Sequence, residues 1–462
     1  MRVIHWFRSD LRLHDNTALA LAVSKASELV PLFILDQRLL ARAGAPRVAF
    51  LLDGLRQLDA QLRRRGNALI VRRGDPTAEI SRLVLETKAE LVTFNRDYSP
   101  YAVRRDAGVA RAVRRAGATV TDCKDRVVFE GNELRTSTGG AYVVYTPYRR
   151  RWLDQLRQVD LDTVKPLRLP PAAPGVSSDT IPASPDGIAG LPSAGEDPAR
   201  RRLKVFLDRA ARSYDRQRDF VAADGTSRLS PCLRFGTISV RECLRQALAR
   251  KRGDRAAASG VGKWIDQLVW RDFYTAIMAE HPHVLTGAFH RAYDRVVWND
   301  DTAAFGAWRE GRTGYPFVDA GMRQLVQTGW MHNRARMVVA SFLVKDLLIN
   351  WQRGEAFFMQ HLVDGDPANN NGGWQWCAST GTDAQPYFRI FNPVTQGERF
   401  DPKGEYVRRY VPELRTVADR FVHRPWAAPS PPRAYPPPIV DHAERRTLAV
   451  ARFEAARNAG ED

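Results

Sequence analysis

Hydrophobic positions in the first third of the chain come in short runs, separated by longer stretches that favour helix. The runs fall at residues 3–7, 30–35, 68–71, 91–94 and 118–121. Between them, apolar residues recur at helical spacing, for example over 48–65 and 77–86. Strands that alternate with helices at this spacing predict a parallel sheet. We therefore expect a Rossmann-like α/β domain over residues 1–130.

The turn after the first predicted strand lacks the glycines of a dinucleotide-binding fold. The strand is followed by Arg-Ser-Asp-Leu-Arg at residues 8–12, where that fold has Gly-x-Gly-x-x-Gly. No phosphate-binding Gly-x-x-x-x-Gly-Lys-Ser/Thr motif occurs in the chain. A standard nucleotide fingerprint is therefore missing from the α/β part.

The pattern changes to helices alone after residue 200. Helical spacing of apolar residues occurs at 201–216, 240–250, 262–281, 316–328, 333–350, 355–363 and 441–459. Before these helices, eight prolines lie between residues 166 and 198, which excludes long helices and central strands there. We predict an inter-domain linker over 131–199 and an all-α domain over 200–462. A Pro-rich recognition segment is the alternative for the linker.

The charge balance is the unusual feature of the composition. Seventy Lys and Arg face 52 Asp and Glu, a net charge of +18 that favours a polyanion such as nucleic acid. A merely basic surface is the alternative. Four scattered cysteines without a Cys-x-x-Cys pair argue against zinc, iron–sulfur clusters and a disulfide framework. With no signal segment and no long apolar run, we expect a soluble, cytoplasmic protein without metal or membrane association.

The stretch 364–383 has the composition of a binding site. It contains acids, three consecutive Asn, glycines and two Trp, which suit a flat ring system with polar edges. A capped helix start explains the same residues equally well. Calcium is excluded because Ala368, Asn369 and Gln375 stand where an EF-hand loop needs Asp or Asn, Gly and Glu.

Three shorter motifs and the tryptophans add to this picture. The loop 225–231 could present hydroxyls and backbone N–H groups to phosphate, or simply lead into a helix. Gln267 and Trp270 share a helix face that suits a nucleobase, although core Trp and surface Gln are commoner. Asn333, Arg336 and Met337 also share a face. Eleven Trp suit a packed core or the relay of an electron.

Several of these motifs occur together, in the same order, in one family. The chain resembles the photolyases of the cryptochrome/photolyase superfamily, and in particular bacterial class I cyclobutane pyrimidine dimer photolyases. The likeness covers nearly the full length and is carried by residues 6–16, 225–230, 270–274, 313–325, 329–334, 364–382 and 387–393. It implies a C-terminal FAD-binding domain and light-dependent DNA repair by electron transfer from reduced FAD to a flipped lesion.

The resemblance also assigns residues to FAD. Positions around its phosphates and adenine would be Tyr214, Thr226, Ser227, Arg228, Leu229 and Ser230. Around the isoalloxazine and ribityl groups would lie Trp264, Arg336, Asp364, Asp366 and Asn370. Arg336 and Asp364 would pair, and Asn370 would face the flavin N5. An electron relay to the surface would run through Trp374, Trp351 and Trp298.

The same matching gives a lesion pocket and a DNA-contacting set. The pocket would consist of Gln267, Trp270, Asn333, Met337 and Trp376, and the phosphate contacts of Arg218, Arg271, Arg334 and Arg389. Gln267 is a departure, because dimer photolyases carry Glu there and an amide cannot transfer a proton. The (6-4) photolyases have this Gln, but also a His pair where the chain has Asn333 and Met337. A cryptochrome-type photoreceptor is the rival from a different class.

The antenna and the partners complete the expectations. Tyr101 and Ala102 stand where folate-binding relatives carry Asn and Glu, which argues against methenyltetrahydrofolate. Phe33, Arg47 and Asp97 are similar to the contacts of 8-hydroxydeazaflavin in other relatives, so we expect an antenna of that type. The partner would be damaged double- or single-stranded DNA, bound by a monomer associated with the bacterial nucleoid.

Overall fold

The computed structural model describes residues 1–159, 161–162, 168–185, 188, 190–383 and 390–459. The chain forms two compact units, each discontinuous in sequence. The first unit comprises Met1–Gly187, Pro192–Asp215 and Ser227–Pro282, and the second Ile188–Leu191, Arg216–Thr226 and His283–Asp462. No described helix is long and apolar enough to cross a membrane.

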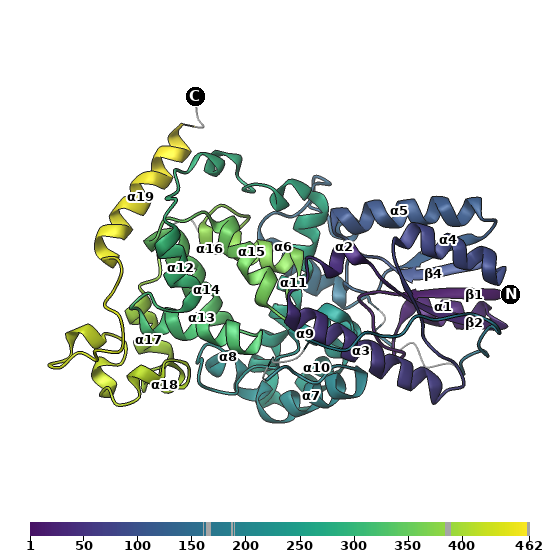
Figure 1. The fold of residues 1–462 in the computed structure, drawn as a ribbon, viewed down its shortest axis with the longest axis horizontal. Helices are drawn as coiled ribbons and strands as arrows, with labels where there is room; N and C mark the ends of the chain where they lie inside the picture. The colour runs from purple at the N-terminus through teal and green to yellow at the C-terminus, as the bar shows by residue number, and fades with distance from the viewer. Residues whose placement is uncertain (160, 163–167, 186–187, 189, 384–389, 460–462) are drawn as a thin grey trace. The chain divides into compact units, whose positions relative to one another are not determined.

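The first unit contains a five-stranded parallel sheet (Figure 1). Its strands are β1 (Arg2–Phe7), β2 (Glu28–Leu35), β3 (Ile70–Arg73), β4 (Leu91–Asn95) and β5 (Thr119–Cys123), in the order β3-β2-β1-β4-β5. In the central strand, Val3 lies opposite Leu29 on one side and Leu91 on the other. Each strand overlaps one of the five predicted runs, so the α/β prediction is confirmed.

Helices connect the strands of this sheet. They are α1 (Thr17–Lys25), α2 (Gln37–Leu40), α3 (Ala45–Arg63), α4 (Pro76–Thr87) and α5 (Pro100–Arg115). Local capping explains where two of them begin: Asn16 accepts from the Leu19 N–H at 3.1 Å, and Asp75 from the Thr77 N–H at 2.8 Å. The apolar faces of α4 and α5 cover a core that includes Ile4, Val30 and Val92.

Part of the proline-rich stretch lies along the outer edge of the sheet. The Asp179 N–H donates to the Val71 carbonyl at 2.8 Å, and the Leu29 N–H donates to the Pro171 carbonyl at 3.0 Å. The Asn67 amide also donates to the Pro170 carbonyl at 3.0 Å. An open strand edge invites pairing with another chain. This stretch therefore protects β3 as well as connecting the parts of the chain.

The remaining helices of the first unit follow the sheet in sequence. They are α6 (Tyr145–Leu156), α7 (Glu196–Arg209), α8 (Tyr214–Gln217, whose last two residues are in the second unit), α9 (Ser230–Phe235), α10 (Val240–Gly253) and α11 (Ala258–Glu280). The predicted helices over 240–250 and 262–281 correspond to α10 and α11. Helix α6 lies inside the predicted linker and was not expected.

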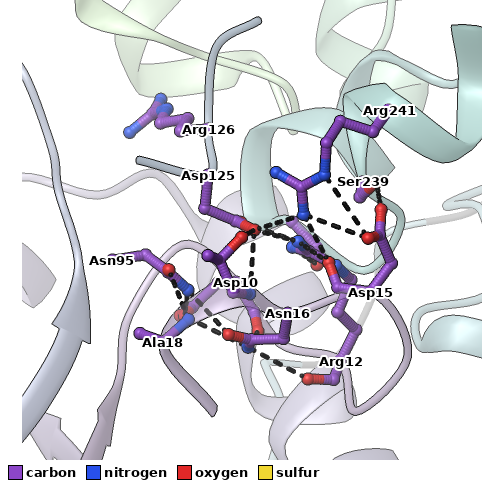
Figure 2. Close-up of polar contacts among 12 residues, drawn as sticks. Asp10, Arg12, Asp15, Asn16, Ala18, Asn95, Asp125, Arg126, Ser239 and Arg241 are labelled. Carbon is purple, nitrogen blue, oxygen red and sulfur yellow. Dashed lines mark hydrogen bonds and ion pairs between the residues drawn. The ribbon is translucent and has the colours of Figure 1, made fainter. Parts of the chain in front are cut away.

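A buried network of charged groups joins the sheet to α10 (Figure 2). Asp125, after β5, accepts from Arg12 at 2.6 Å and from Arg241 at 2.9 Å. Arg241 also pairs with Asp15 at 3.2 Å, and Ser239 donates to the same carboxylate. Burial would raise the pKa of Asp125, but the Arg12 and Arg241 charges outweigh it and hold the pKa below its usual range. All these partners belong to the first unit.

Amides complete this network next to β4. The Asn95 side chain donates to Asp10 at 2.6 Å and to the Asn16 amide oxygen at 2.8 Å. Burial raises the pKa of Asp10. Gly236 also approaches this corner, where a Cβ would stand 2.1 Å from the Ser9 carbonyl oxygen. The 6–16 motif therefore fixes the corner between β1, β4 and α10, which is a structural role.

The second unit is helical, and none of its described residues forms a strand. Its helices are α12 (Thr302–Glu310), α13 (Pro316–Thr328), α14 (Asn333–Ser341), α15 (Trp351–His361), α16 (Pro367–Ala378), α17 (Pro393–Phe400), α18 (Glu405–Tyr410) and α19 (His442–Asn458). The all-α prediction for the C-terminal part is confirmed. The predicted helix over 333–350 ends early, because α14 passes into a π-helical turn at Phe342–Asp346.

Candidate functional site

The stretch 364–383 forms a capped helix start and a buried polar cluster at once. Asp366 caps α16 by accepting from the Asn369 N–H at 3.0 Å, with Pro367 in the first turn. Even so, Asp364, Asp366 and Asn370 are 8, 9 and 9% exposed. All three have partners within the protein, and their carboxylates and amide are also the groups that suit a polar ligand. The two interpretations of the sequence therefore do not exclude each other.

Arg336 and Asp364, assigned to the flavin, form an ion pair. The Arg336 Nη2 lies 3.1 Å and 2.8 Å from the two carboxylate oxygens of Asp364. The Arg336 Nε also donates to the Met331 carbonyl at 2.9 Å. The guanidinium is thus fixed in place at the start of α14, beside the loop that leads into α16.

The three consecutive asparagines have different roles. The Asn369 amide bonds Asp366 at 2.9 Å, and Asn371 donates to the Val284 carbonyl at 2.9 Å. Asn370 donates to the Glu355 carbonyl at 3.1 Å. Burial raises the pKa of Glu355 to about 7, against a smaller lowering by its bond from Asn371. Asn370, assigned to the flavin N5, thus bonds the backbone of Glu355, whereas the Glu355 carboxyl accepts from Asn371 at 3.2 Å.

Trp374 packs deep in the second unit and keeps one donor unused. Its ring is 2% exposed and meets Phe358 and Trp308 edge to face, at centroid distances of 4.9 and 6.2 Å. Its indole N–H is buried without a hydrogen-bond partner among the described residues. Together with the buried acids and Asn370, this donor fits a polar, aromatic cofactor such as FAD.

The other two predicted relay residues belong to the same unit. Trp351 is 3% exposed, whereas Trp298 is half-buried and packs against Phe453 of α19 at 5.8 Å. Trp374 and Trp351 are therefore interior, and Trp298 is nearer to solvent. This gradient of burial is the one that a relay from an interior cofactor to the surface requires.

The FAD residues assigned to the first unit surround one loop. Trp264, on α11, donates from its Nε1 to the Ser227 Oγ at 3.2 Å and packs on Phe206 at 5.1 Å. Tyr214 meets the same Phe206 edge to face. Arg228 has a left-handed φ of 48°, Leu229 is 1% exposed, and Ser230 begins α9. Thr226 is the last residue of a second-unit segment.

The lesion-pocket residues also fall in both units, and each set is described by itself. In the first unit, the half-buried Gln267 donates back to the Lys263 carbonyl at 3.3 Å. In the second, Asn333 is exposed and its amide lies 3.6 Å from the Met337 sulfur. Trp376 is half-buried beside Phe391 at 6.4 Å. Asn333 and Met337 thus share the helix face that the sequence predicts.

Trp270 has a partner that the sequence analysis missed. The Tyr145 ring of α6 stacks on its indole with the centroids 3.6 Å apart and the planes 7° apart. No local signal could have revealed this pair, because 125 positions separate the two residues in the chain. The Tyr-rich segment around 145 could only have been noted as an amphipathic stretch within the predicted linker.

Three of the four predicted phosphate-binding arginines can be described. Arg334 pairs with Asp219 at 2.9 Å with its side chain 13% exposed, and lies over the Phe400 ring at 4.3 Å. The Arg271 side chain is 14% exposed, and donates to the Arg126 carbonyl at 2.6 Å. Arg218 is 26% exposed and 3.9 Å from Asp219. Arg389 lies outside the described residues.

The predicted antenna residues lie in the first unit, near the carboxyl ends of its strands. Phe33 and Arg47 are each 7% exposed, and Asp97 pairs with Arg126 at 2.9 Å. Burial would raise the pKa of Asp97, but the charges of Arg126, Arg105 and Arg8 hold it below its usual range. Tyr101 donates to Asp36 after β2. No group of His, Cys, Asp and Glu placed to hold a metal occurs in the described part of the chain.

Comparison with known proteins identifies the family. Residues 3–171 match the family model described as DNA photolyase, and residues 264–455 match the FAD binding domain of DNA photolyase. The chain is 43% identical to a deoxyribodipyrimidine photo-lyase of Escherichia coli, over 98% of both proteins. The protein therefore belongs to the DNA photolyase family.

Solved structures agree with this assignment. A bacterial class III photolyase from Agrobacterium tumefaciens superposes with a TM-score of 0.92 at 38% identity, over 99% of this chain and 98% of that one. An archaeal photolyase from Sulfolobus tokodaii, described with two FAD molecules, gives 0.81 at 33%, over 98 and 100%. A Synechocystis cryptochrome gives 0.90 at 26%, over 97 and 98%. The fold is thus common to photolyases and cryptochromes.

Proposed function

We propose that this protein is a light-driven lyase that splits cyclobutane pyrimidine dimers in DNA, with FAD as its cofactor. The observation that carries this proposal is the agreement, over nearly the whole length, with relatives named deoxyribodipyrimidine photo-lyase. The FAD-binding family model covers both residues of the Arg336–Asp364 pair. Nothing in the reaction demands a nucleophile or a metal.

Reduced FAD, when bound, supplies an electron to the lesion after absorbing light. The chain's own residues prepare that event. Arg336 and Asp364 hold a fixed pair of opposite charges, and Asn370 offers an amide beside them. Trp374, Trp351 and Trp298 conduct an electron inward from the surface when the oxidised cofactor must be reduced. These roles are part of the proposal.

Lesion recognition would use the pocket residues that the resemblance predicts. Trp270 and Trp376 offer aromatic faces for a flipped pyrimidine pair, and Asn333 offers an exposed amide. Gln267 can donate a hydrogen bond to a pyrimidine carbonyl but cannot give it a proton. We further propose a monomer that acts on damaged DNA, double- or single-stranded, within the bacterial nucleoid.

An oligonucleotide with a single thymine dimer tests this function. The purified protein, with its FAD chemically reduced, should convert the dimer to two thymines under blue light and leave it intact in darkness. Chromatography of the digested oligonucleotide measures the conversion. Asn333→Ala and Trp270→Ala should weaken binding of the damaged strand while FAD stays bound. Absence of conversion by fully reduced protein in the light would refute the repair function.

Gln267 keeps two other functions open, namely a cryptochrome-type photoreceptor and (6-4) photoproduct repair. The fold does not distinguish a photolyase from a cryptochrome, because a photolyase and a cryptochrome superpose on the chain almost equally well. Gln267→Glu restores the acid of the dimer photolyases and should raise the quantum yield of dimer splitting. An oligonucleotide with a (6-4) photoproduct serves as the control substrate. Repair of that substrate alone would favour the (6-4) alternative.

For the antenna we propose a flavin-like chromophore, of the 8-hydroxydeazaflavin type, bound near Phe33, Arg47 and Asp97. Methenyltetrahydrofolate is the less favoured choice because Tyr101 occupies the position of the folate-binding Asn and already bonds Asp36. The Sulfolobus relative is described with a second FAD, which supports the broader class of flavin-like antennas. Extraction of the native chromophores and their absorption spectra will distinguish the three.

A further inference from the structure

Helix α6 lies within the predicted linker, yet it packs along α11, the helix that carries Gln267 and Trp270 (Figure 1). Its side chains at positions 145, 149 and 152 point to one partner because residues three and four apart share a helix face. Each of them contacts α11 near the proposed lesion pocket. Both helices belong to the first unit.

The Tyr145 contact is the closest of the three. Its ring lies flat on the Trp270 indole, with 3.6 Å between centroids. Its hydroxyl donates to the Asp266 carbonyl at 3.0 Å, one residue before Gln267. Tyr145 is 8% exposed, while Trp270 remains half-buried. One indole face is therefore covered by tyrosine, and part of the ring is left for another contact.

Two polar contacts fix α6 in register with α11. The Arg149 Nε donates to Asp266 Oδ1 at 2.5 Å. One turn further on, the Trp152 Nε1 donates to Asp272 Oδ2 at 3.2 Å, and Trp152 is fully buried. Sliding the tyrosine ring along the indole would break the buried Trp152–Asp272 hydrogen bond and the more exposed Arg149–Asp266 contact.

We propose that Tyr145 is a positioning residue for lesion recognition, which holds the Trp270 indole as a preformed wall for the flipped pyrimidine pair. A flat wall that is already in its bound orientation loses little conformational entropy when the lesion arrives. The inference rests on the proposed function, because it requires Trp270 to contact the lesion. It assigns a role in recognition to a helix from the predicted linker.

Loss of the Tyr145 stack should weaken the binding of damaged DNA and leave the binding of undamaged DNA unchanged. Undamaged DNA is held mainly through its phosphates, so its affinity does not depend on the indole. A lesion that stacks on Trp270 loses affinity when the indole is free to turn. The interaction free energy of an aromatic pair corresponds to about a two- to tenfold change in affinity.

The experiment compares Tyr145→Leu and Tyr145→Phe with Tyr148→Phe as the matched control. Tyr148 is on the same helix, and its buried hydroxyl has no partner among the described residues, so its removal disturbs no hydrogen bond. Tyr145→Phe keeps the ring and loses only the bond to the Asp266 carbonyl. Dissociation constants are measured for the full-length holoprotein with dimer-containing and undamaged oligonucleotides, and FAD content is recorded for each variant.

The stacking of Tyr145 on Trp270 predicts which variants lose affinity for the dimer. Tyr145→Leu should weaken binding of the dimer about two- to tenfold and leave undamaged DNA unchanged, whereas Tyr145→Phe and Tyr148→Phe should stay within about twofold of the parent. In a Trp270→Ala background, Tyr145→Leu should have no further effect on the dimer, because the two residues act as one unit. Near-UV circular dichroism should show the loss of the stacked pair in Tyr145→Leu alone.

Equal losses for damaged and undamaged DNA, or an undiminished effect in the Trp270→Ala background, would show a merely structural role and overturn the proposal. Should Tyr145→Leu fail to fold, Tyr145→Phe still decides, because loss of damage discrimination with the ring retained contradicts the stacking argument. A parent protein that binds both oligonucleotides equally would instead refute the proposed function and not the role of the stack.

Discussion

Three identical side chains in a row, Asn369 to Asn371, show what a residue-level pattern can and cannot reveal. The sequence marks the run as polar and suitable for a ligand. In the structure, Asn369 bonds the capping residue Asp366 of α16, and Asn371 donates to the Val284 backbone carbonyl. Asn370 donates to the Glu355 backbone carbonyl. Only the helical phase and the neighbouring chain decide between these roles, and the neighbour cannot be inferred from local sequence.

Glu355 leads to a prediction on pH. Its folded-state pKa of about 7 is raised by burial above its unfolded value, so folding favours the protonated acid. The stability associated with that acid is present below the unfolded pKa and is lost as the pH rises through the folded pKa. Glu355→Gln cannot ionise and does not lose this stability. The melting temperature of Glu355→Gln minus that of the parent should therefore rise by a few degrees as the pH increases from about 4.5 to 7.

Thermal unfolding of the holoprotein across this range measures the effect. Glu454→Gln, an exposed acid on α19, is the control and should follow the parent at every pH. Parallel profiles for Glu355→Gln and the parent would mean that the carboxyl is already ionised in the folded protein, contrary to the prediction.

At the scale of elements, the contact between α15 and α16 depends on one glycine. A Cβ on Gly354 would stand 2.2 Å from the Trp374 Cη2, and no rotamer of a buried indole relieves such an overlap. Gly354→Ala should lower stability by about 1–3 kcal/mol and loosen bound FAD, because Trp374 must move. Calorimetry and the FAD-to-protein absorbance ratio measure both effects.

Gly373→Ala is the matched control for this substitution. It is also a helical glycine, one residue before Trp374, but nothing lies within 4 Å of its added Cβ. Alanine should therefore leave stability unchanged or raise it by about 0.5–1 kcal/mol, through its better helix propensity. Similar losses in both variants would mean that the glycines serve the backbone and not the indole.

The C-terminal helix α19 contacts Trp298 and the residues before and after it in the chain. Arg452 donates to the Val297 carbonyl at 2.8 Å and to the Asn299 side chain at 2.9 Å, and the next residue, Phe453, packs on Trp298. Arg452→Ala should therefore increase amide hydrogen exchange at 297–299 and the quenching of Trp298 fluorescence by acrylamide. Arg446→Ala, exposed on the same helix, should change neither. Unaltered exchange in Arg452→Ala would show that Phe453 and the bonds from Asn299 to the Leu347 and Leu348 carbonyls are enough to hold the segment.

Comparison of sequence and structure shows which elements were predictable. Helix α13 (Pro316–Thr328) begins and ends where its apolar spacing predicts, and Gly329 caps its end. Helix α6 was missed because its apolar face covers α11, about 115 residues further along the chain, and carries no signal of its own without that partner. Periodicity thus locates elements, while the contacts between distant elements, such as Tyr145 with Trp270, follow only from the fold.

At the scale of the whole molecule, composition predicts the net charge well. It does not predict which partners the charged side chains have. The net charge of +18 predicts a polyanion. Many of the cations nevertheless have internal partners: Arg12 and Arg241 fix the corner shown in Figure 2, and Arg334 pairs with Asp219. The count of 70 Lys and Arg therefore overstates the number of cations that are free to neutralise phosphates.

The ion pairs of the arginines predict a ranking of the proposed phosphate contacts. Each phosphate neutralised contributes about 0.9 to the slope of log affinity against log salt concentration. Arg218 has the most exposed side chain of the three described arginines and only a 3.9 Å approach to Asp219. Arg218→Ala should therefore lower the slope by about 1, whereas Arg334→Ala should lower it less, since its 2.9 Å pair with Asp219 must first open. Fluorescence anisotropy with an undamaged duplex, between about 50 and 200 mM salt, measures both slopes.

The ratio of damaged to undamaged affinity provides the internal control. Phosphate contacts are common to both ligands, so Arg218→Ala should weaken both equally and leave the ratio unchanged. Stacking on Trp270 is specific to the lesion, so Trp270→Ala should lower the ratio and leave the slope unchanged. If Arg218→Ala lowered the ratio instead, its guanidinium would contact the lesion itself, and the division of labour between basic surface and aromatic pocket would be wrong.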